Sequence, residues 1–586
     1  MRPLLRLKPY LLRYKKTLLF GLLTVIGSNV FTVVQPMFLG KAVDELKHGI
    51  ESHTFVSGDL LLWAGLIVGF SIIAGICTFL TRQTIIVASR HIEFDLRNDL
   101  LSHLQKLSYS YFQNTPTGDL MAHATNDISA VRNAVGPGIM YPSDTVMTLS
   151  FVLMMMFMAD WQLTLLVLIP MPFVSYVVYR LGKLVNKIFT DRQEQFSLLT
   201  THAQETLSGV RIIKAYVREE YESERFRKLS WEYLKKNLVL AQVQSIMWPL
   251  MFVLVGISLV IAIYFGGLKV IDGRMTIGTL TAFTAYLSML IWPMIAFGWV
   301  TNILQQGAAS MNRLATIFDK EPEIKDTGTT DHSIDHIDGG IEFRSVSFTH
   351  KNAAQPTLKN INLMIEPGTT VAIVGYTGSG KSTLVNLLPR LYDITGGELL
   401  IDGKDIRNIP LDVLRSSIGF VPQETFLFSE TIAENIRYGV DEFKEEDLHS
   451  AAETSQIAKD VLEFPKQFNT TIGERGITLS GGQKQRTSIA RAIMRQPKIL
   501  ILDDALSAVD TFTEEKILQH LREFMKGRTS IIISHRISTV KDADLIVVLQ
   551  NGAIIERGTH DDLVSFGGIY ADLHQKQLLE QQLEEM

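Results

Sequence analysis

Long apolar runs crowd the first three hundred residues of the chain and are absent from the rest. A helix needs about 20 consecutive apolar residues to cross a bilayer. Six runs reach this length, at residues 17–43, 60–80, 139–159, 161–178, 243–265 and 277–300. The pattern therefore predicts a membrane domain of six helices, which we place at residues 1–319.

Two long polar connections separate the second run from the third and the fourth from the fifth. Residues 81–132 and 179–236 keep a helical apolar period while becoming charged, so we expect them to continue the membrane helices into the cytoplasm. Gly118 and Gly209 mark the points where each extension is predicted to turn. Short crosswise helices at these turns would press on a cytoplasmic domain formed by the rest of the chain. The alternative is a pair of solvated hairpins without a partner.

Lysine and arginine predict the orientation. They crowd the N-terminus (Arg2, Arg6, Lys8, Arg13, Lys15 and Lys16) and the two long connections. Because basic residues stay on the cytoplasmic side, we predict a multi-pass protein of the cell (inner) membrane with both termini in the cytoplasm. The basic, amphipathic N-terminus itself is typical of a short helix lying along the membrane surface.

Three features of the apolar runs are candidates for contact with a bound small molecule. Asp144 is an ionisable residue in the third run, where a carboxylate is costly unless it faces a cavity or a partner. We expect it near the outer end, where a solvated position at the mouth is the alternative. The run Met154 to Met156 offers polarizable side chains, and Pro293 permits a kink in the sixth helix. A methionine run of this kind more often packs against other helices or faces lipid.

The second half of the chain has the patterning of a globular domain. A polar, acidic linker is predicted at residues 320–340, followed by a second domain at residues 341–586, whose motifs, described next, predict nucleotide binding. Short apolar runs at 341–348, 362–365 and 371–374 predict strands.

A glycine-rich loop follows the third of these strands and leads into a predicted helix. It consists of Gly375, Tyr376, Thr377, Gly378, Ser379, Gly380, Lys381, Ser382 and Thr383. This spacing matches a phosphate-binding loop, in which backbone N–H groups surround an anion. Lys381 would reach the β- and γ-phosphates of a nucleotide, and the Ser382 hydroxyl would bind Mg²⁺. The loop predicts binding of ATP or a similar triphosphate together with Mg²⁺.

A second buried strand, residues 499–502, ends in two adjacent carboxylates. Asp503 is placed to hold the water shell of Mg²⁺, and Asp504 to orient or deprotonate the water that attacks the γ-phosphate. Together with the phosphate loop, this pair predicts nucleotide hydrolysis.

A second glycine-rich helix start lies between these two elements. It contains Ser480, Gly481, Gly482 and Gln483, and it is another candidate anion site. This signature, with the phosphate loop and six spans, resembles the ATP-binding-cassette (ABC) exporters of half-transporter type along essentially the whole chain. The resemblance implies a six-helix transmembrane domain with long cytoplasmic helical extensions, followed by an α/β P-loop domain with an α-helical subdomain.

The resemblance also implies a second half-transporter as partner, with each ATP lying between one chain's phosphate loop and the other chain's signature. Gln423 resembles the glutamine that contacts Mg²⁺ and water, and His535 the switch histidine at the γ-phosphate. Residues 473–476 resemble the exporter-specific loop that contacts the coupling helices, and residues 507–510 the segment that crosses to the partner.

Two positions depart from the family pattern. His350 stands where an aromatic residue, usually tyrosine, stacks on adenine, so we expect a weaker contact with the base. Asp504 stands where glutamate is usual, and its shorter side chain moves the carboxylate back by about 1–1.5 Å. A general base must lie within hydrogen-bond distance of the proton that it takes. We expect this site to hydrolyse ATP poorly and the chain to pair with a partner that supplies glutamate.

The whole pattern predicts ATP-driven export of hydrophobic or amphipathic compounds, drugs or lipids, by alternating access. A homodimeric lipid flippase and an ATP-gated channel or regulatory subunit are the alternatives. The net charge of −5 argues against a nucleic-acid partner. Cys77 is the single cysteine, which excludes an internal disulfide.

Overall fold

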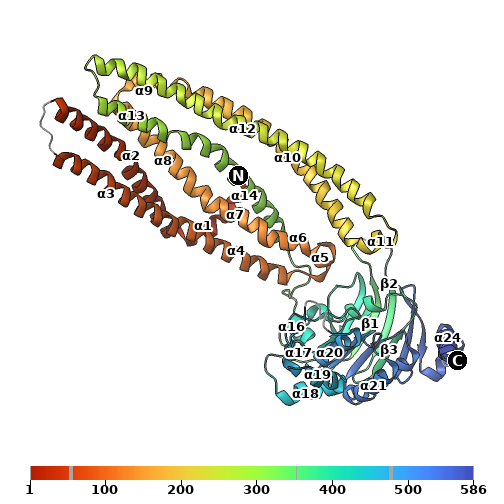
Figure 1. Cartoon of the computed structure of the whole chain (residues 1–586). Coiled ribbons are helices and arrows are strands. Elements are labelled where there is room, and N and C mark those ends of the chain that lie inside the picture. Colours follow the sequence, from red (N-terminus) through yellow and green to blue (C-terminus); the bar gives the residue numbers. More distant parts are fainter. Residues whose placement is uncertain (1, 52–56, 352, 474–478, 585–586) are drawn as a thin grey trace. The chain divides into compact units, whose positions relative to one another are not determined.

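The computed structural model describes the whole chain except residues 1, 52–56, 352, 474–478 and 585–586 (Figure 1). The chain forms two compact units. The first contains Met1–Gln105 and Thr117–Lys320, and the second contains Lys106–Pro116 and Glu321–Met586. The second unit thus takes up a short segment from the middle of the helical half.

The described residues of the first unit form helices joined by short turns. It begins with a 3₁₀ turn (Arg2–Leu7) and α1 (Lys8–Arg13). Its further helices are α2 (Lys15–Glu51), α3 (Ser57–Thr81), α4 (Val87–Lys106), α6 (Thr117–Ala122), α7 (Ile128–Val135), α8 (Pro137–Ala159), α9 (Trp161–Leu168), α10 (Met171–Ser208), α11 (Val210–Ala215), α12 (Glu219–Ile271), α13 (Ile277–Met289) and α14 (Ile291–Phe318). Single π-helical turns at Arg82–Ile86 and His123–Asp127 connect α3 to α4 and α6 to α7.

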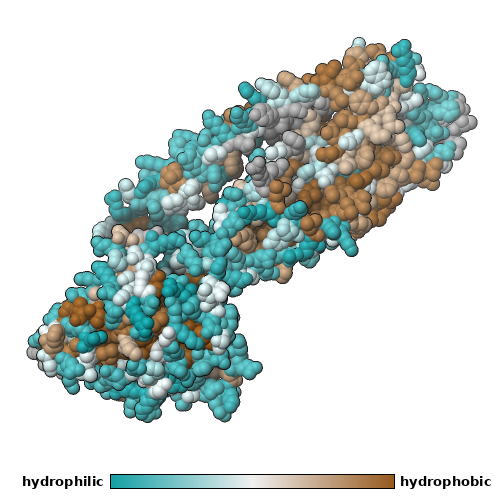
Figure 2. Space-filling view, turned by 180° about the vertical axis from the view of Figure 1, so that it is seen from behind, coloured by the Kyte–Doolittle hydropathy of each residue, from teal (hydrophilic) through white to brown (hydrophobic). Residues whose placement is uncertain are grey.

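All six predicted membrane runs lie on these helices. Within the described residues, four continuous helical stretches have the length and hydropathy to cross a membrane, and one shorter helix is apolar. The four are Lys15–Glu51, Gly58–Lys106, Thr117–Ala159 and Ile277–Phe318, and the shorter helix is Val255–Ile271. Figure 2 shows hydrophobic residues gathered over one stretch of the helical unit, with hydrophilic residues on the helices beyond it.

Small residues let the helices approach closely. A Cβ added at Gly278 of α13 would lie 1.9 Å from the carbonyl oxygen of Gly40 in α2, so only glycine fits this crossing. Nearby, Val33, Met156 and Phe283 are almost fully buried and form an apolar core between α2, α8 and α13. The core therefore fixes how these long helices lie against one another.

The predicted turn at Gly118 is wrong, whereas the turn at Gly209 is confirmed. Gly118 lies inside α6, and the chain turns earlier, at Ser108 and Thr115, on either side of the short helix α5 (Tyr109–Asn114). Pro116 explains the difference, because the residue before a proline is disfavoured in a helix. At the other turn, α10 ends at Ser208, Gly209 caps it, and α11 follows.

Asp144 does not lie near an outer end of the bundle as expected. Its Oδ1 accepts a hydrogen bond of 2.8 Å from Nδ2 of Asn29 in α2. Asn29 is close to the middle of the first apolar run, and the contact places Asp144 at the same level. Because the third run follows a connection predicted to lie on the inner side, its first residues are predicted to lie in the inner half.

The second unit contains two sheets. A four-stranded antiparallel sheet has the order β2-β1-β4-β5, and a six-stranded sheet has the order β10-β9-β3-β8-β7-β6. The strands are β1 (Ile341–Phe348), β2 (Leu358–Ile365), β3 (Thr370–Val374), β4 (Gly396–Ile401), β5 (Lys404–Asp405), β6 (Ile418–Val421), β7 (Ile499–Asp503), β8 (Thr529–Ile533), β9 (Leu545–Gln550) and β10 (Ala553–Gly558).

Helices complete the second unit. They are α15 (Lys381–Asn386), α16 (Leu411–Ser416), α17 (Ile432–Arg437), α18 (Glu445–Thr454), α19 (Ala458–Glu463), α20 (Gly481–Met494), α21 (Thr511–Met525), α22 (Ile537–Val540), α23 (His560–Phe566) and α24 (Ile569–Glu584). The six-stranded sheet separates two apolar cores, because alternate residues of its strands face opposite sides. In β7, for example, Leu500 and Leu502 join one core while Ile499 and Ile501 join the other.

Most predicted elements of this unit agree with the structure. The first strand has the predicted bounds, and β3 begins one residue earlier than predicted. β2 begins at Leu358, four residues before the predicted start, because Leu358 pairs with Phe348 of β1. Between Lys320 and Gly340 the chain forms no helix or strand, and Ile334 and Ile337 are buried in the core of the second unit.

The segment Lys106–Pro116 packs on the second unit through specific contacts. The Ser108 hydroxyl accepts a hydrogen bond from the Ile324 N–H at 2.9 Å, and the Tyr109 ring meets the Tyr392 ring edge to face at 5.8 Å. Leu107 is 6% exposed. Burial raises the pKa of Tyr392 to about 12, as expected for a phenol held against other rings.

Candidate nucleotide site

Four neighbouring parallel strands end at the same edge of the six-stranded sheet. In the order β3, β8, β7 and β6, each is parallel to the next. Ligands of open α/β sheets bind at the carboxyl ends of such strands. A cavity of about 250 Å³ lies there, lined by Thr357, Thr377, Gly378, Gly380, Lys381, Ser382, Thr383, Gln423, Asp503, Asp504, Ile533 and His535. The predicted catalytic and Mg²⁺-binding residues therefore come together in one place.

The glycines of the loop after β3 have backbone conformations that other residues rarely adopt. Gly375, Gly378 and Gly380 have φ values of 148°, 83° and 103°. A Cβ at Gly375 would lie 2.2 Å from the carbonyl oxygen of Leu549, whereas one at Gly378 would point into open space. The loop thus leaves room at Gly378 for a phosphate group to approach its backbone N–H groups, as the motif requires.

Lys381 is the first residue of α15, and its side chain closes the loop. Its Nζ donates hydrogen bonds to the carbonyl oxygens of Gly375 at 2.8 Å and Tyr376 at 3.0 Å. Burial lowers the pKa of Lys381, while the negative charges of Asp503 and Asp504 act in the opposite direction. A buried ammonium held by backbone carbonyls is well placed to attract a polyanion.

Ser382 and Asp503, the two residues predicted to bind Mg²⁺, lie next to each other in the cavity. The Ser382 hydroxyl donates to Asp503 Oδ1 at 3.1 Å, and Asp503 is 4% exposed. Burial raises the pKa of Asp503, and the neighbouring Asp504 charge adds to this effect. Mg²⁺ prefers oxygen ligands and often takes only one or two from the protein, with phosphate oxygens and water supplying the rest. The hydroxyl and carboxylate fit that requirement, and among the described residues no cluster of three metal-binding side chains competes with them.

Asp504 has a left-handed backbone conformation, with φ of 49°. Its N–H donates to the carbonyl oxygen of Ile533 at 2.9 Å, and its own carbonyl accepts from the Ser507 hydroxyl at 3.0 Å. Aspartate adopts this conformation more readily than most residues with a side chain. The backbone is therefore fixed on both sides, and the short carboxylate projects into the cavity from a defined point.

Gln423 and His535 reach the cavity from the strands on either side of β7. Gln423 lies two residues after β6, and His535 two residues after β8. The carbonyl of His535 also accepts a hydrogen bond from Gln577 of α24. Both side chains line the phosphate cavity, and their predicted roles toward Mg²⁺, water and the γ-phosphate stay predictions.

Three residues of the predicted loop do not line the cavity. Gly375 belongs to the turn, and Tyr376 is 42% exposed. Ser379 is 5% exposed, and its hydroxyl has no hydrogen-bond partner. A buried hydroxyl without a partner in a phosphate-binding loop is compatible with a partner supplied by the bound nucleotide.

His350 does not line the phosphate cavity. Its ring lies edge to face with Phe348 at 4.8 Å and with Tyr392 at 5.4 Å. It borders a second cavity of about 610 Å³, to which α5 contributes Ser110, Gln113 and Asn114. Its stacking on adenine stays a prediction.

The signature residues do not line the phosphate cavity either. Ser480 caps α20, and its hydroxyl accepts from the Gln483 N–H at 3.2 Å while the Gln483 Oε1 accepts from the Ser480 N–H at 3.0 Å. Gly481 and Gly482 form the first turn of the helix. The exporter-specific loop predicted at residues 473–476 lies, apart from Gly473, outside the described residues.

Sequence reasoning missed three residues that shape the site. Thr357 and Ile533 line the cavity, and Gln485 holds the segment after Asp504. The Gln485 Oε1 accepts from the Ala508 N–H at 2.9 Å, and its Nε2 donates to the Ser507 hydroxyl at 3.0 Å. Gln485 lies about one turn after the start of α20, and its place next to the signature was the one feature of the sequence that could have drawn attention to it. Thr357 directly precedes β2, whose start was not predicted correctly.

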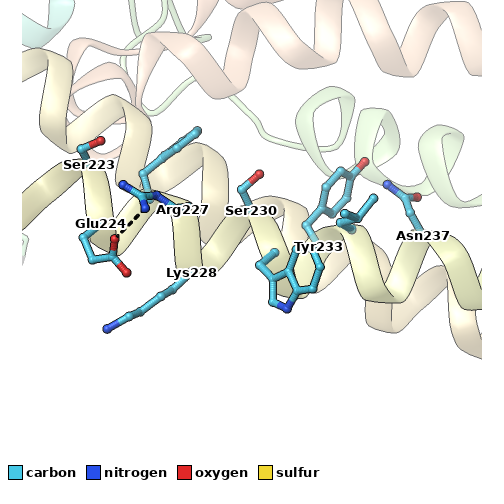
Figure 3. Close-up of a pocket in the computed structure, with 10 residues that line it drawn as sticks. Ser223, Glu224, Arg227, Lys228, Ser230, Tyr233 and Asn237 are labelled. Carbon is cyan, nitrogen blue, oxygen red and sulfur yellow. Dashed lines mark ion pairs between the residues drawn. The ribbon is translucent and has the colours of Figure 1, made fainter.

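A further cavity of about 760 Å³ runs along one face of α12 and shares no residue with the phosphate site (Figure 3). Phe226 and Trp231 are 41% and 58% exposed there, and an ion pair of 3.3 Å joins Glu224 to Arg227. The other lining residues are Ser223, Lys228, Ser230, Tyr233, Leu234 and Asn237.

Comparisons with known proteins agree with the fold and site. The ABC transporter transmembrane region matches residues 18–294, and the ABC transporter domain matches residues 358–507. The probable multidrug resistance ABC transporter ATP-binding/permease protein YheI of Bacillus subtilis is 37% identical, over 98% of this chain and 96% of that protein. The ATP-dependent lipid A-core flippase of Syntrophus aciditrophicus is 38% identical, over 90% of this chain and 88% of that protein.

A solved structure supports the same conclusion. It is titled as a bacterial Atm1-family ABC exporter with ATP bound, and it matches with a TM-score of 0.79 and 27% identity over 96% of this chain and 99% of that one. A helical membrane domain and an α/β nucleotide domain in one chain define a membrane-spanning transporter that hydrolyses ATP. The chain belongs to the ABC transporter family, among the half-size exporters.

Proposed function

We propose that the chain is one half of an ATP-driven exporter of hydrophobic or amphipathic compounds, in which the site containing Asp504 hydrolyses ATP slowly. The observation that carries this proposal is the cavity at the ends of β3, β6, β7 and β8, where every expected catalytic group is present but the general base is shortened to aspartate. The chain can therefore still bind ATP, but the carboxylate of Asp504 lies farther from the attacking water than a glutamate carboxylate would.

Each residue of the site has a role in this proposal. Lys381 and the loop N–H groups hold the phosphates, and Ser382 and Asp503 hold Mg²⁺, which would neutralise charge on the phosphates. Gln423 and Asp504 orient the water, and His535 contacts the γ-phosphate. His350 packs against the base.

The signature belongs, in this proposal, to the partner's ATP site. Ser480–Gln483 are intact and lie outside the cavity of their own chain. A second half-transporter with glutamate at the position of Asp504 would pair with this signature to form a fast site. The exposed aromatic residues on α12 in Figure 3 lie outside the predicted membrane runs, where lipid would not cover them, and this favours a protein partner there.

The membrane domain would work by alternating access, with both termini and the nucleotide domain in the cytoplasm. The helices α5 and α11 are the short crosswise elements that would transmit closure of the nucleotide domains to the membrane helices. The α5 segment already packs on Tyr392 and Glu323 of its own nucleotide domain.

The cargo class is proposed from the relatives and from the apolar helices. Some relatives are named multidrug resistance proteins, and others are named lipid A-core flippases. The second candidate is therefore a homodimeric lipid flippase with two Asp504 sites, and the 38% identity to the flippase is the observation that favours it.

Purification of the complex from its source through a tag on this chain tests the proposal. A second, different half-transporter carrying glutamate at the matching position would support one slow and one fast site. A dimer of this chain alone would contradict the asymmetric assembly. Lipid-stimulated ATPase activity of that dimer would then support the flippase, and ion flux without stoichiometric ATP consumption would support a channel.

A further inference from the structure

Asp144 is a carboxylate inside the membrane bundle that a buried amide holds in place. Asn29 of α2 is 5% exposed, and its Nδ2 donates both to the carbonyl oxygen of Val25 at 3.0 Å and to Asp144 Oδ1 at 2.8 Å. Thr148, one turn after Asp144 on α8, donates from its hydroxyl to the Asn29 Oδ1. These bonds fix the direction of the carboxylate from two helices that are distant in sequence.

No basic side chain of the described chain forms an ion pair with Asp144. Two other carboxylates of the same unit do form ion pairs with basic side chains. Asp160 pairs with Lys269 at 2.6 Å, and Asp127 pairs with Arg313. Ionisable residues at membrane depth are expensive, so a carboxylate held there without a cation calls for an external source of positive charge.

Aromatic residues lie at the same level of the bundle. Tyr141, one turn before Asp144, meets Trp299 of α14 edge to face at 4.7 Å. Gly138 faces Ile303 and Leu304, so α8 and α14 run in opposite directions, and the level of Asp144 falls between Trp299 and Trp292.

These tryptophans share one face of α14, two turns apart, and are 46% and 51% exposed. Exposed indole rings attract organic cations through their π faces, and they offer flat apolar surface to the rest of such a molecule. The carboxylate and the rings therefore suit the same kind of ligand.

We propose that Asp144 is a specificity-determining residue that selects lipophilic organic cations as cargo, with Trp292 and Trp299 as the aromatic surface. This inference rests on the proposed export function and names its substrate class. A permanently charged cation supplies the missing positive charge and buries its apolar groups against the indoles. An anion of the same shape would place two negative charges together and is disfavoured.

Equilibrium binding to the full complex in lipid nanodiscs tests the inference. The probes are tetraphenylphosphonium and tetraphenylborate, which share size and shape and differ in the sign of their charge. The variants are Asp144→Asn, which still accepts the Asn29 hydrogen bond, and Asp144→Glu, which keeps the charge. Asp272→Asn makes the same change in net charge at an exposed residue after α12 and serves as the control.

We expect Asp144→Asn to weaken tetraphenylphosphonium binding by about tenfold, the change expected when one charge-assisted contact is lost. Tetraphenylborate binding should not weaken, Asp144→Glu should retain most of the cation binding, and the control should bind as the parent does. Unchanged cation binding in Asp144→Asn, or an equal loss for both probes, would overturn the inference.

A separate transport assay distinguishes this inference from the export proposal. ATP-dependent movement of an uncharged lipophilic dye should persist in Asp144→Asn. If the parent complex moves no dye with ATP while its cation binding depends on Asp144, the export proposal fails and the cation site stands. If the parent exports the dye but binds both probes alike in all variants, the cation site fails and export stands.

Discussion

The nucleotide domain and the membrane domain each hold carboxylates in a protected site, but they balance the charge differently. Asp503 and Asp504 lie with Lys381 in one cavity, and Ser382 donates to Asp503. Among the described residues, Asp144 is paired with the neutral amide of Asn29 and with no cation. The first site carries its own cation and is suited to a ligand rich in negative charge. The second leaves a negative charge for a ligand to balance.

The two sites also differ in how their residues are brought together. In the nucleotide domain, neighbouring strands of four to five residues end at one edge, so the position of a side chain follows from its place at a strand end. In the membrane domain, the site depends on the crossing of long helices such as α2, whose approach to α13 requires glycine at 40 and 278.

Lys381→Ala should have the largest effect, because it removes the cation on which the first site depends. We expect ATP affinity to fall by about 10²-fold, since the phosphates would then meet the carboxylates of Asp503 and Asp504 without the ammonium. Binding of a fluorescent ATP analogue to the purified complex measures this. Lys526→Ala removes an exposed lysine of the same domain and should bind normally. Equal affinity of both variants would contradict the charge-balance comparison.

Asp504→Glu should raise ATP turnover at this site in the natural assembly by up to about 10²-fold, because the longer side chain restores the reach of the base. Glutamate tolerates a φ of 49° less well than aspartate does, so a small loss of thermal stability should accompany the gain. Phosphate release is measured in complexes whose other site is inactivated, with Asp504→Asn as the inactive reference. Unchanged turnover would show that aspartate already reaches the water.

Gly278→Ala tests whether close helix contact positions the membrane site. The new Cβ would clash with the backbone of α2, and we expect a loss of roughly 1–3 kcal/mol in stability as α2 and α13 separate. Gly267→Ala, in α12, meets open space and is the matched control. Thermal unfolding in detergent should separate the two variants, and equal melting temperatures would argue against this view of the bundle.

Asp503→Asn should have the smallest effect on the protein, and the size of that effect should depend on pH. Burial raises the pKa of Asp503 above its ordinary value of 3.8, so the folded protein binds this proton more tightly than the unfolded chain does. The resulting stability is present below pH 3.8 and is lost as pH rises through the raised pKa. Asparagine avoids this loss, and we expect a gain of a few degrees in melting temperature at pH 7 without nucleotide.

The same comparison should give no gain at pH 3.5, where the parent carboxyl is protonated. A gain of equal size at both pH values would mean that packing, and not the buried charge, is responsible. Melting curves of both proteins across this range give the answer.

Sequence predicted the nucleotide site well because its residues sit in motifs at strand ends. Asp503 and Lys381 were placed correctly from the apolar runs that precede them. The left-handed backbone of Asp504 was not predictable, because it depends on hydrogen bonds with Ile533 and Ser507. Ile533 is distant in the sequence, and nothing in the sequence indicates that Ser507 bonds to Asp504.

The membrane domain was predicted less completely. Hydropathy located the six helical runs, but it does not show which residues of one helix lie beside which residues of another. The contact between Asp144 and Asn29 was therefore not predicted. Gly118 was taken as a helix end although a helix tolerates a single glycine, and Pro116 nearby carried the stronger signal.

The docking of residues 106–116 on the nucleotide domain has a practical consequence for producing that domain alone. A fragment beginning at residue 321 would lose Leu107 and Tyr109 and would expose the surface around Tyr392, which is 8% accessible in the intact chain. Exposed apolar patches promote self-association, so such a fragment should be prone to aggregate. The soluble unit is therefore better obtained by fusing residues 106–116 through a flexible linker than by a single cut in the chain.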